Sequence, residues 1–278
     1  MFAVGPVLTP HGRLLLAPVD DAPGLPPDVT RRIEPSFARG SGHGLLQLGA
    51  GEVGTALPPV YGYWREFSAR YVTAVCTLPD AGDRGALAHV PALSNEDLES
   101  LASAAPLMTG AEYLTASVLR ALWDALDTAF RSELSESRAS VQDFLSRKSP
   151  AWHLVGRVHF NLAENRKDED APFAFLATYT TQLSAHAKAQ HLPLGQALRE
   201  YAGAANKARL LSLLLPVQRA AEQCAWLKTM VEAGEIYHPL RWSPSEAFQL
   251  LTDLPLLESA GIVVRVPGTW RASRPPRH

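Results

Sequence analysis

Apolar residues recur at steps of three and four along much of this 278-residue chain, which is the spacing of amphipathic helices. One run of this kind covers residues 60–75, directly after Pro59, and a longer one covers 114–134 and resumes over 141–145. Further helices are predicted over residues 28–39, 194–201, 205–215, 217–233, 246–251 and 254–260. Helices therefore account for most of the expected secondary structure.

Short polar signals predict where several of these helices begin. Capping boxes, in which Ser or Thr precedes an acidic residue by three positions, occur at residues 94–97, 109–112 and 243–246. Asp28 is expected to cap the first helix, and Gly40 is expected to end it. Pro216 suits the first position of a new helix, so the pattern predicts a break before it.

Apolar runs and one stretch of alternating apolar and polar residues predict a few strands between the helices. Residues 2–8 and 13–19 flank a turn at 9–12 and are expected to form a hairpin. From residue 152 to 162 the even positions are apolar, which predicts a strand, and residues 173–179 can return as its partner. A last strand is predicted over 262–266. The expected fold class is α+β and helix-rich, with small β hairpins and amphipathic helices packed around them.

The change of pattern along the chain predicts three regions. Residues 1–148 form an N-terminal α+β region, and residues 149–235 form a hairpin followed by helices. Residues 236–278 form a C-terminal region that ends in a basic, proline-rich tail.

Three glycines match the G-x-G-x-x-G spacing of dinucleotide-binding loops: Gly49, Gly51 and Gly54. That motif needs a strand before it, for which residues 45–48 are the candidate, and a helix directly after it. Pro58 and Pro59 delay any helix beyond the reach of a phosphate, and residues 73–78 are apolar where an acidic residue is expected. We therefore favour a turn, with the dinucleotide site as the alternative, and interpret residues 40–44 as a helix stop and flexible turn.

Composition limits the function classes. Twenty-six basic and 28 acidic residues give a net charge of −2, which argues against a wholly basic nucleic-acid module but allows a local basic patch. The two cysteines, Cys76 and Cys224, are far apart and resemble small buried apolar residues in a reducing compartment. Neither a secretory signal nor an apolar run of membrane-spanning length is evident, so no membrane partner and a cytoplasmic location are expected.

Four histidines and an acidic run are weaker candidates for chemistry. His186 and His191 are interpreted either as a shared metal site or as helix surface and loop. His153, Arg157 and His159 share a predicted strand face. This face is interpreted either as a binding surface for phosphate or a partner, or as a solvent-exposed outer face of the sheet. The acidic residues Glu164, Asp168, Glu169 and Asp170 lack the spacing of a calcium loop.

The tail combines cations with an aromatic ring. Arg265, Arg271, Arg274 and Arg277 surround Trp270, a set that can hold a phosphate backbone and stack on a base. A linker to another domain is the alternative interpretation. No P-loop occurs, because Arg147 and Leu227 occupy the glycine positions before the two Lys-Ser/Thr pairs.

Several long strings resemble the N-terminal region of bacterial Swi/Snf-family helicase-like ATPases. They are FARGSGHGLLQLGAGEVGTALPP, HFNLAENRKDEDAPFAFLATYTTQLSAHAKAQHLPLGQALREYAG, LLSLLLPVQRAAEQ and GEIYHPLRWSPSEAFQLLTDLPLLESAGIVVRVPGTW. The last one is similar to the beginning of that family's helicase-associated domain, which residues 236–278 would then contain in part.

The resemblance implies that the full-length protein is an ATP-driven translocase on double-stranded DNA with two RecA-like lobes. The motor would lie C-terminal in the same polypeptide and would use ATP and magnesium, so the chain is expected to be a fragment without catalytic residues, cofactor or metal of its own. It would regulate the motor or contact DNA or partners. A stand-alone interaction scaffold, or a dinucleotide-binding enzyme using Gly49, Gly51 and Gly54, are the alternatives.

Overall fold

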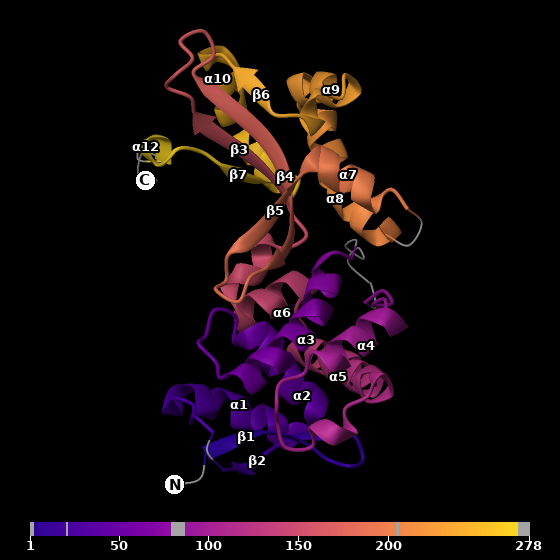
Figure 1. Ribbon diagram of the computed structural model, residues 1–278. Coiled ribbons are helices and arrows are strands. Elements are labelled where there is room, and N and C mark those ends of the chain that lie inside the picture. Colours follow the sequence, from indigo (N-terminus) through magenta and orange to yellow (C-terminus); the bar gives the residue numbers. More distant parts are fainter. Residues whose placement is uncertain (1–2, 21, 79–86, 204–205, 272–278) are drawn as a thin grey trace. The chain divides into compact units, whose positions relative to one another are not determined.

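The computed structural model of the chain describes residues 3–20, 22–78, 87–203 and 206–271 (Figure 1). As the sequence predicts, the fold is α+β and rich in helices, with a small hairpin and a separate sheet.

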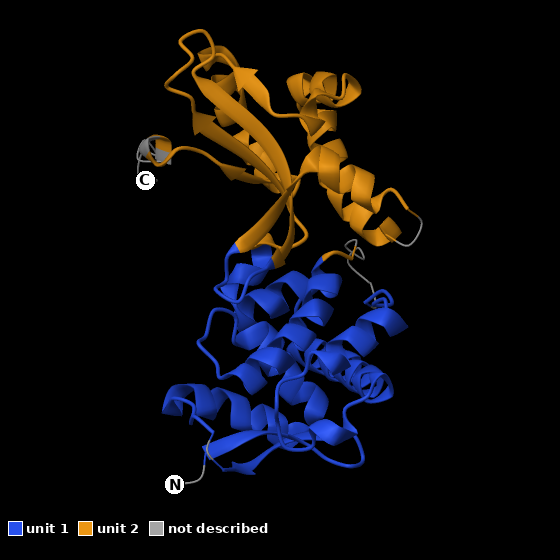
Figure 2. Cartoon of the chain, in the orientation of Figure 1, with its two compact units in different colours: residues 1–76, 81–153, 183–188 blue, residues 77–80, 154–182, 189–278 orange. Residues whose placement is uncertain are grey.

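The chain divides into two compact units (Figure 2). Unit 1 comprises residues 1–76, 81–153 and 183–188, and unit 2 comprises residues 77–80, 154–182 and 189–278. The sequence predicts three regions instead, with boundaries after residues 148 and 235. That division remains a prediction.

Unit 1 is helical apart from one antiparallel hairpin, β1 (Ala3–Leu8) with β2 (Leu14–Val19), which confirms the predicted pair within the described residues. Its helical elements are α1 (Pro27–Arg39), α2 (Ser41–Leu46), the π-helix η1 (Gln47–Gly51), α3 (Pro59–Cys76), α4 (Asn95–Ser103), η2 (Ala111–Tyr113), α5 (Ala116–Ser137), α6 (Val141–Lys148) and η3 (Pro150–Leu154). The hairpin packs mainly against α1, α2 and α3.

The core of unit 1 is a chain of aromatic rings between α3, α5 and α6. The rings meet edge to face in the order Trp64, Phe67, Trp123, Tyr71, Phe130 and Phe144, with centroids 5.3–6.0 Å apart. Such pairs each contribute about 0.5–1.5 kcal/mol beyond the burial of their surface. The 3.6-residue periodicity of the sequence placed Trp64, Phe67, Tyr71 and Phe130 on the predicted stripes, whereas the burial of Trp123 was not predicted.

The predicted helix starts are only partly correct. Ser94 caps α4 by accepting a hydrogen bond from the Asp97 N–H, as expected. Thr109 is not a cap: Thr115 begins α5 instead and accepts from the Val118 N–H. Asp28 also differs from its prediction, because it lies in the first turn of α1 and pairs with Arg32 four residues on.

Unit 2 is built on a sheet in the order β5-β4-β3-β7, with β6 paired to β4. The strands are β3 (Val158–Glu164), β4 (Phe173–Leu183), β5 (Ala189–Pro193), β6 (Leu240–Trp242) and β7 (Val263–Arg265). The β3–β4 hairpin and β7 were predicted, whereas β5 and β6 were not. The predicted strand start at Trp152 is wrong, because Trp152 and Leu154 lie on η3 and the strand begins at Val158.

Helices cover one face of this sheet. They are α7 (Leu194–Tyr201), α8 (Lys207–Gln223), α9 (Ala225–Glu232), η5 (Glu235–Tyr237), α10 (Pro244–Thr252) and α11 (Leu254–Ser259), and α12 (Gly268–Arg271) follows β7. The covered face contributes Phe160, Phe175 and Tyr179 to the core, and the Tyr179 hydroxyl lies 2.7 Å from the Ser212 hydroxyl of α8.

Two sequence signals in these helices had opposite outcomes. The Ser243–Glu246 capping box is complete at the start of α10, with both reciprocal hydrogen bonds present. The break expected before Pro216 is absent, because α8 runs through Pro216 and ends at Gln223. Cys224, which follows α8, is buried as predicted, whereas Cys76 at the end of α3 is only partly buried.

Candidate functional site

The face of the unit 2 sheet opposite its helices carries polar side chains, of which those of His159, Thr178 and Thr180 are buried. Side chains alternate between the two faces of a strand, and Val158, Phe160 and Leu162 of β3 point to the helices. His159 and Asn161 therefore lie on the opposite face, where the register pairs His159 with Thr178 of β4 and Asn161 with Arg265 of β7. This face, together with His191 of β5, is the candidate site and is called the polar face below.

A chain of hydrogen bonds orients the middle of the polar face. The Asn161 amide donates to the Leu176 carbonyl at 2.9 Å and to the Thr178 hydroxyl oxygen at 3.1 Å. The Thr178 hydroxyl lies 3.2 Å from His191 Nδ1 and the Thr180 hydroxyl lies 3.4 Å from the same nitrogen. Either His191 Nδ1 or the threonine hydroxyls can donate in these contacts, depending on the tautomer of the ring.

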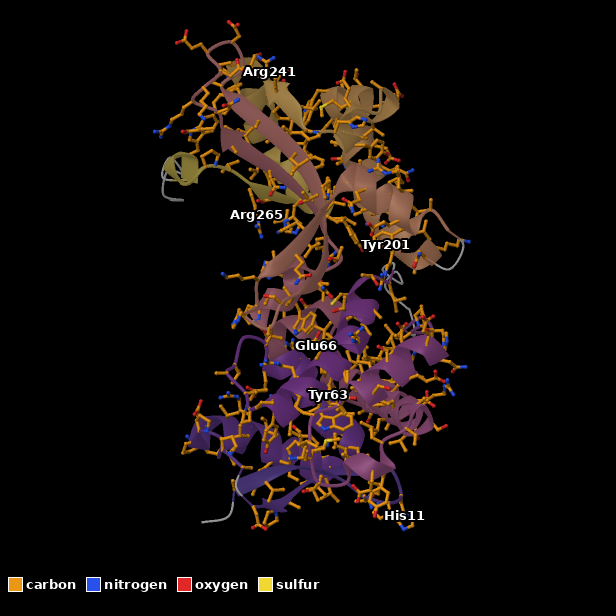
Figure 3. All side chains as sticks on the ribbon, viewed as in Figure 1. His11, Tyr63, Glu66, Tyr201, Arg241 and Arg265 are labelled. Atoms are coloured by element: carbon orange, nitrogen blue, oxygen red, sulfur yellow. The ribbon has the colours of Figure 1, made fainter. Side chains whose placement is uncertain are left out.

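Arg265, which Figure 3 labels, lies opposite Asn161 of this network in register. Burial lowers the pKa of His191, and the positive charge of Arg265 lowers it further. Both effects act against the charged imidazolium, which is why the neutral ring is favoured. Among the residues that the structure describes, Arg265 forms no ion pair, and it is partly buried.

His159 corrects one prediction from the sequence. The alternation placed it on a wet outer face with His153 and Arg157, but its side chain is fully buried. Its Nε2 lies 3.3 Å from the Leu154 carbonyl, and its ring meets the His191 ring edge to face at 4.7 Å. His153 is exposed and lies on η3 rather than on the strand, so the predicted three-residue surface does not form.

The other cation on this sheet is neutralised. Arg241 of β6 lies opposite Ala174 in register, and its Nε donates to Asp168 at 2.7 Å. Hydrogen bonds from the Ala171 N–H and from Arg241 lower the pKa of Asp168, which keeps the carboxylate charged. Figure 3 labels both arginines, Arg241 on β6 and Arg265 on β7. The difference between the paired Arg241 and the unpaired Arg265 decides which of them is available to a ligand.

The predicted grouping of Arg265 with Trp270 is not what the structure shows. The Trp270 ring packs edge to face on Phe173 at 5.0 Å, against the core that the helices cover. Phe173 belongs to the opposite sheet face from Arg265, as the register of β3 with β4 and β7 shows. Trp270 is therefore a core contact rather than a stacking platform beside Arg265.

The remaining tail residues are not placed with Arg265. Arg271 ends α12, and its side chain lies outside the description. Arg274 and Arg277 fall outside the described residues altogether.

The glycine segment of unit 1 differs from both interpretations drawn from the sequence. Residues 41–46, predicted as a flexible turn and then a strand, form α2, and Gly49 and Gly51 lie in η1 rather than in a turn. Of Gly49, Gly51 and Gly54, only Gly54 has a left-handed φ, of 79°. A Cβ on Gly49 would meet the Ser68 side chain at 2.3 Å, so this glycine permits close contact with α3. The strand that a dinucleotide loop requires before its glycines is replaced by a helix.

A buried carboxylate holds the end of this segment. Glu52 is fully buried and accepts from Arg32 Nε at 2.8 Å and Arg32 Nη2 at 2.9 Å. Gln47 Nε2 at 3.2 Å and Thr55 Oγ1 at 2.9 Å complete its partners, while Arg65 donates to the Glu52 carbonyl. With both oxygens occupied by donors of the chain, Glu52 is a structural group.

A second charged cluster in unit 1 joins α2, α5 and α6. Glu133 lies 2.8 Å from His43 Nδ1 and accepts from Lys148 Nζ at 3.0 Å. Burial alone would raise the pKa of Glu133, but the hydrogen bonds with His43 and Lys148 outweigh it and lower the pKa. The three groups satisfy one another and tie three helices together.

The structure adds no support to the metal interpretations. In the described part of the chain, no three His, Cys, Asp or Glu side chains gather as a metal site would require. His186 lies in the turn before β5 and His191 lies on β5, so neither is on a helix. Of the helices between residues 3 and 271 that are described, none has both the length and the apolar character needed to cross a bilayer.

Comparisons with protein-family models, with curated proteins and with solved structures gave no match to this chain. The resemblance to the Swi/Snf family therefore stays a prediction from the quoted strings.

Proposed function

We propose that this chain is a non-catalytic accessory region of a Swi/Snf-type ATP-dependent DNA translocase, and that it contacts the DNA backbone through the polar face of unit 2. The observation that carries the second part is Arg265, a partly buried cation without a carboxylate partner among the described residues. The first part is supported by the quoted sequence strings. ATP hydrolysis and magnesium belong, in this proposal, to a motor in the same polypeptide.

The chemistry of the polar face suits a phosphate oxygen. A guanidinium presents several N–H donors in a rigid fork and binds phosphate through short, charge-assisted hydrogen bonds. The neutral Asn161 lies opposite Arg265 in register and hydrogen-bonds to the neutral Thr178. An anion approaching Arg265 therefore meets no repulsion from these neighbours, and a partly buried position weakens screening by salt.

The test is duplex binding as a function of salt. Fluorescence anisotropy with a labelled DNA duplex should show weak binding. The logarithm of the association constant should fall linearly with the logarithm of the salt concentration. Arg265→Gln should reduce this slope by about 0.9, the contribution of one phosphate contact. Arg241→Gln is the matched control, because Arg241 is already paired with Asp168, and it should leave the slope nearly unchanged.

The same titration separates the polar face from the tail. If a variant with alanine at positions 271, 274 and 277 loses binding while Arg265→Gln retains it, the tail carries the DNA contact and the assignment to the polar face is wrong. If neither the wild type nor any variant binds DNA at low salt, the DNA-contacting function is wrong.

A stand-alone interaction scaffold is the second candidate, and one observation favours it. Phe248 of α10 is 70% exposed and Leu256 of α11 is 37% exposed, which places apolar side chains of unit 2 in solvent. The two candidates differ in the genome: a reading frame that continues beyond codon 278 into motor motifs supports the accessory region, and a stop codon there supports the scaffold.

A further inference from the structure

The strand β5 is short and stands at one end of the strand order in the unit 2 sheet. It comprises residues 189–193 and is followed in the order β5-β4-β3-β7 by β4. Its last residue, Pro193, has no N–H to donate to a neighbouring strand. Because so few backbone hydrogen bonds are available, side-chain contacts contribute much of what holds β5 in place.

Two side chains of β5 hold it to the sheet, one on each face. Leu192 packs against the apolar core of unit 2. His191 points to the opposite face, where its Nδ1 lies 3.2 Å from the Thr178 hydroxyl and 3.4 Å from the Thr180 hydroxyl. Its ring also meets the ring of the fully buried His159 edge to face, with centroids 4.7 Å apart. We call these contacts of His191 the His191 anchor.

The two faces respond differently to acid. The contact of Leu192 is apolar and contains no group that titrates. An imidazole in a buried contact is favoured in its neutral form, because the charged form loses its hydration. Burial accordingly lowers the pKa of His191, and the positive charge of Arg265 lowers it further. When β5 leaves the sheet, the ring returns to water and to its ordinary pKa of about 6.5.

The described surroundings of His191 place no carboxylate against its ring. From β4 it meets the two threonine hydroxyls, and from β3 it meets the imidazole of His159, which is itself titratable. Arg157 directly precedes β3, is partly buried and shares the side of His159 by the alternation of the strand. The helix α7 contacts β5 from the core face, and its titratable residues are the exposed Arg199 and Glu200 and the core residue Tyr201.

We propose that β5 is an acid-released strand, which the His191 anchor holds on the sheet at neutral pH and which opens locally as the pH falls. The opening is confined to β5, because Leu194, Ala197 and Tyr201 fix the following helix α7 in the core. It uncovers the ring of His159 and the part of β4 that carries Thr178 and Thr180. The device is a property of the sheet alone and does not depend on the proposed function.

The linkage has a definite sign. The released strand binds a proton on His191 at a higher pH than the paired strand does, so pairing is fully retained above the ordinary pKa of about 6.5. As the pH falls from there towards the lowered pKa of the paired state, each release takes up one proton and the equilibrium constant for release increases. For a single titrating group the increase is at most about tenfold per pH unit.

Hydrogen exchange of backbone amides measures the release in the wild-type protein. Exchange rates at residues 189–192, corrected for the intrinsic pH dependence of exchange, give the equilibrium constant for opening of β5. Between pH 7.5 and pH 5.5 this constant should rise about three- to tenfold, while that of the core helix α8 in the same samples stays nearly unchanged. A constant for β5 that does not rise, or that rises only as much as that of α8, would overturn the inference.

His191→Gln separates His191 from other groups that titrate in this range. Glutamine can still hydrogen-bond to the threonine hydroxyls but does not titrate, so the variant should lose most of the pH dependence at residues 189–192. His153→Gln is the matched control, because His153 is exposed on η3, and it should keep the wild-type response. An equal response in wild type and His191→Gln would contradict the role of the anchor.

A second measurement decides the question if His191→Gln already opens β5 at pH 7.5. NMR of the ring carbons of the wild-type protein should show that His191 titrates below the ordinary pKa of about 6.5. A His191 pKa at or above that value would overturn the inference, because the paired state would then bind the proton as well as the released state does. None of these measurements involves DNA, so their outcome is independent of the DNA-contacting function.

Discussion

Removing Arg32 should destabilise unit 1 far more than its surface position suggests. The side chain of Arg32 is 44% exposed, but its partner Glu52 is fully buried and receives two of its four side-chain hydrogen bonds from this guanidinium. Arg32→Ala leaves the buried carboxylate with only the neutral donors of Gln47 and Thr55. The substitution therefore tests whether the burial of the Glu52 carboxylate, rather than the exposure of Arg32, determines how much the free energy of unfolding falls.

The magnitude follows from the exposure of the two partners. Breaking a buried ion pair by removing one partner costs about 3–5 kcal/mol, because an uncompensated charge remains inside the protein. Water can reach the space that the half-exposed guanidinium leaves, so we expect the lower part of that range or slightly less, about 2–3 kcal/mol. The pair between Arg32 and Asp28 is exposed at both ends, 44% and 62%, so Asp28→Ala should cost less than about 0.5 kcal/mol.

Urea unfolding of the two variants, followed by tryptophan fluorescence, measures the comparison. Trp64 lies in the core of unit 1, on the helix that follows the Glu52 segment, and reports on it. An Arg32→Ala variant as stable as Asp28→Ala would refute the reasoning, since it would mean that Glu52 does not depend on its buried ion pair. An Arg32→Lys variant should recover part of the loss, because lysine keeps the charge but provides no bidentate fork.

Two further predictions concern unit 1. A Cβ on Gly42 would lie 2.1 Å from the Ala125 carbonyl oxygen, so Gly42→Ala should force α2 away from α5 and cost about 1–3 kcal/mol. Gly62→Ala is the matched control, because a Cβ at Gly62 would have no atom within 4 Å. In the same urea titration it should be neutral or stabilise the protein by up to about 1 kcal/mol. The lowered pKa of Glu133 means that its contribution to stability is present above the unfolded-state pKa of about 4.3 and is lost as the pH falls through the lower folded-state value. Unfolding measured from pH 6 to pH 3 should therefore decline less steeply for Glu133→Gln than for wild type, and an equally steep decline would contradict the role of the His43–Glu133 pair.

The parts of the fold that were predicted correctly have local causes. The β1–β2 hairpin follows from two apolar runs on either side of a turn, the alternation of residues specifies β3 in the β3–β4 pair, and α10 follows from a complete capping box. Each of these signals lies within a few residues of the structure that it specifies. The helix stripe of α3 is equally local, because its apolar residues share one face whatever packs against them.

The glycine segment was misinterpreted because glycine has two structural uses. A positive φ favours glycine, as at Gly54, but so does the close approach of two helices. At Gly42 and Gly49 a side chain would overlap α5 and α3 respectively, and both residues are helical. A single sequence does not distinguish these two uses, because the close approach of a second helix depends on residues that are distant in the sequence.

The candidate site depends on non-local pairing, which limited its prediction. His191 lies on β5, a strand of five residues that contains a proline and was not predicted. Arg265 was assigned to a basic tail, whereas its position on the polar face depends on β7 pairing in parallel with β3. The burial of His159 follows from the same missing strand, because His191 packs against its ring. Pro216 illustrates the converse, a strong local signal that the packing of α8 overrides.

The late position of β7 in the sequence affects the order in which the two units can fold on the ribosome. Apart from the short segment 183–188, unit 1 is specified by residues up to 153, so its core can form while the remainder is being translated. The sheet of unit 2 is complete only when residues 263–265 emerge and join β3. Until then one edge of β3 is unpaired, and nascent unit 2 exposes a strand edge that chaperones would have to protect from pairing with other chains.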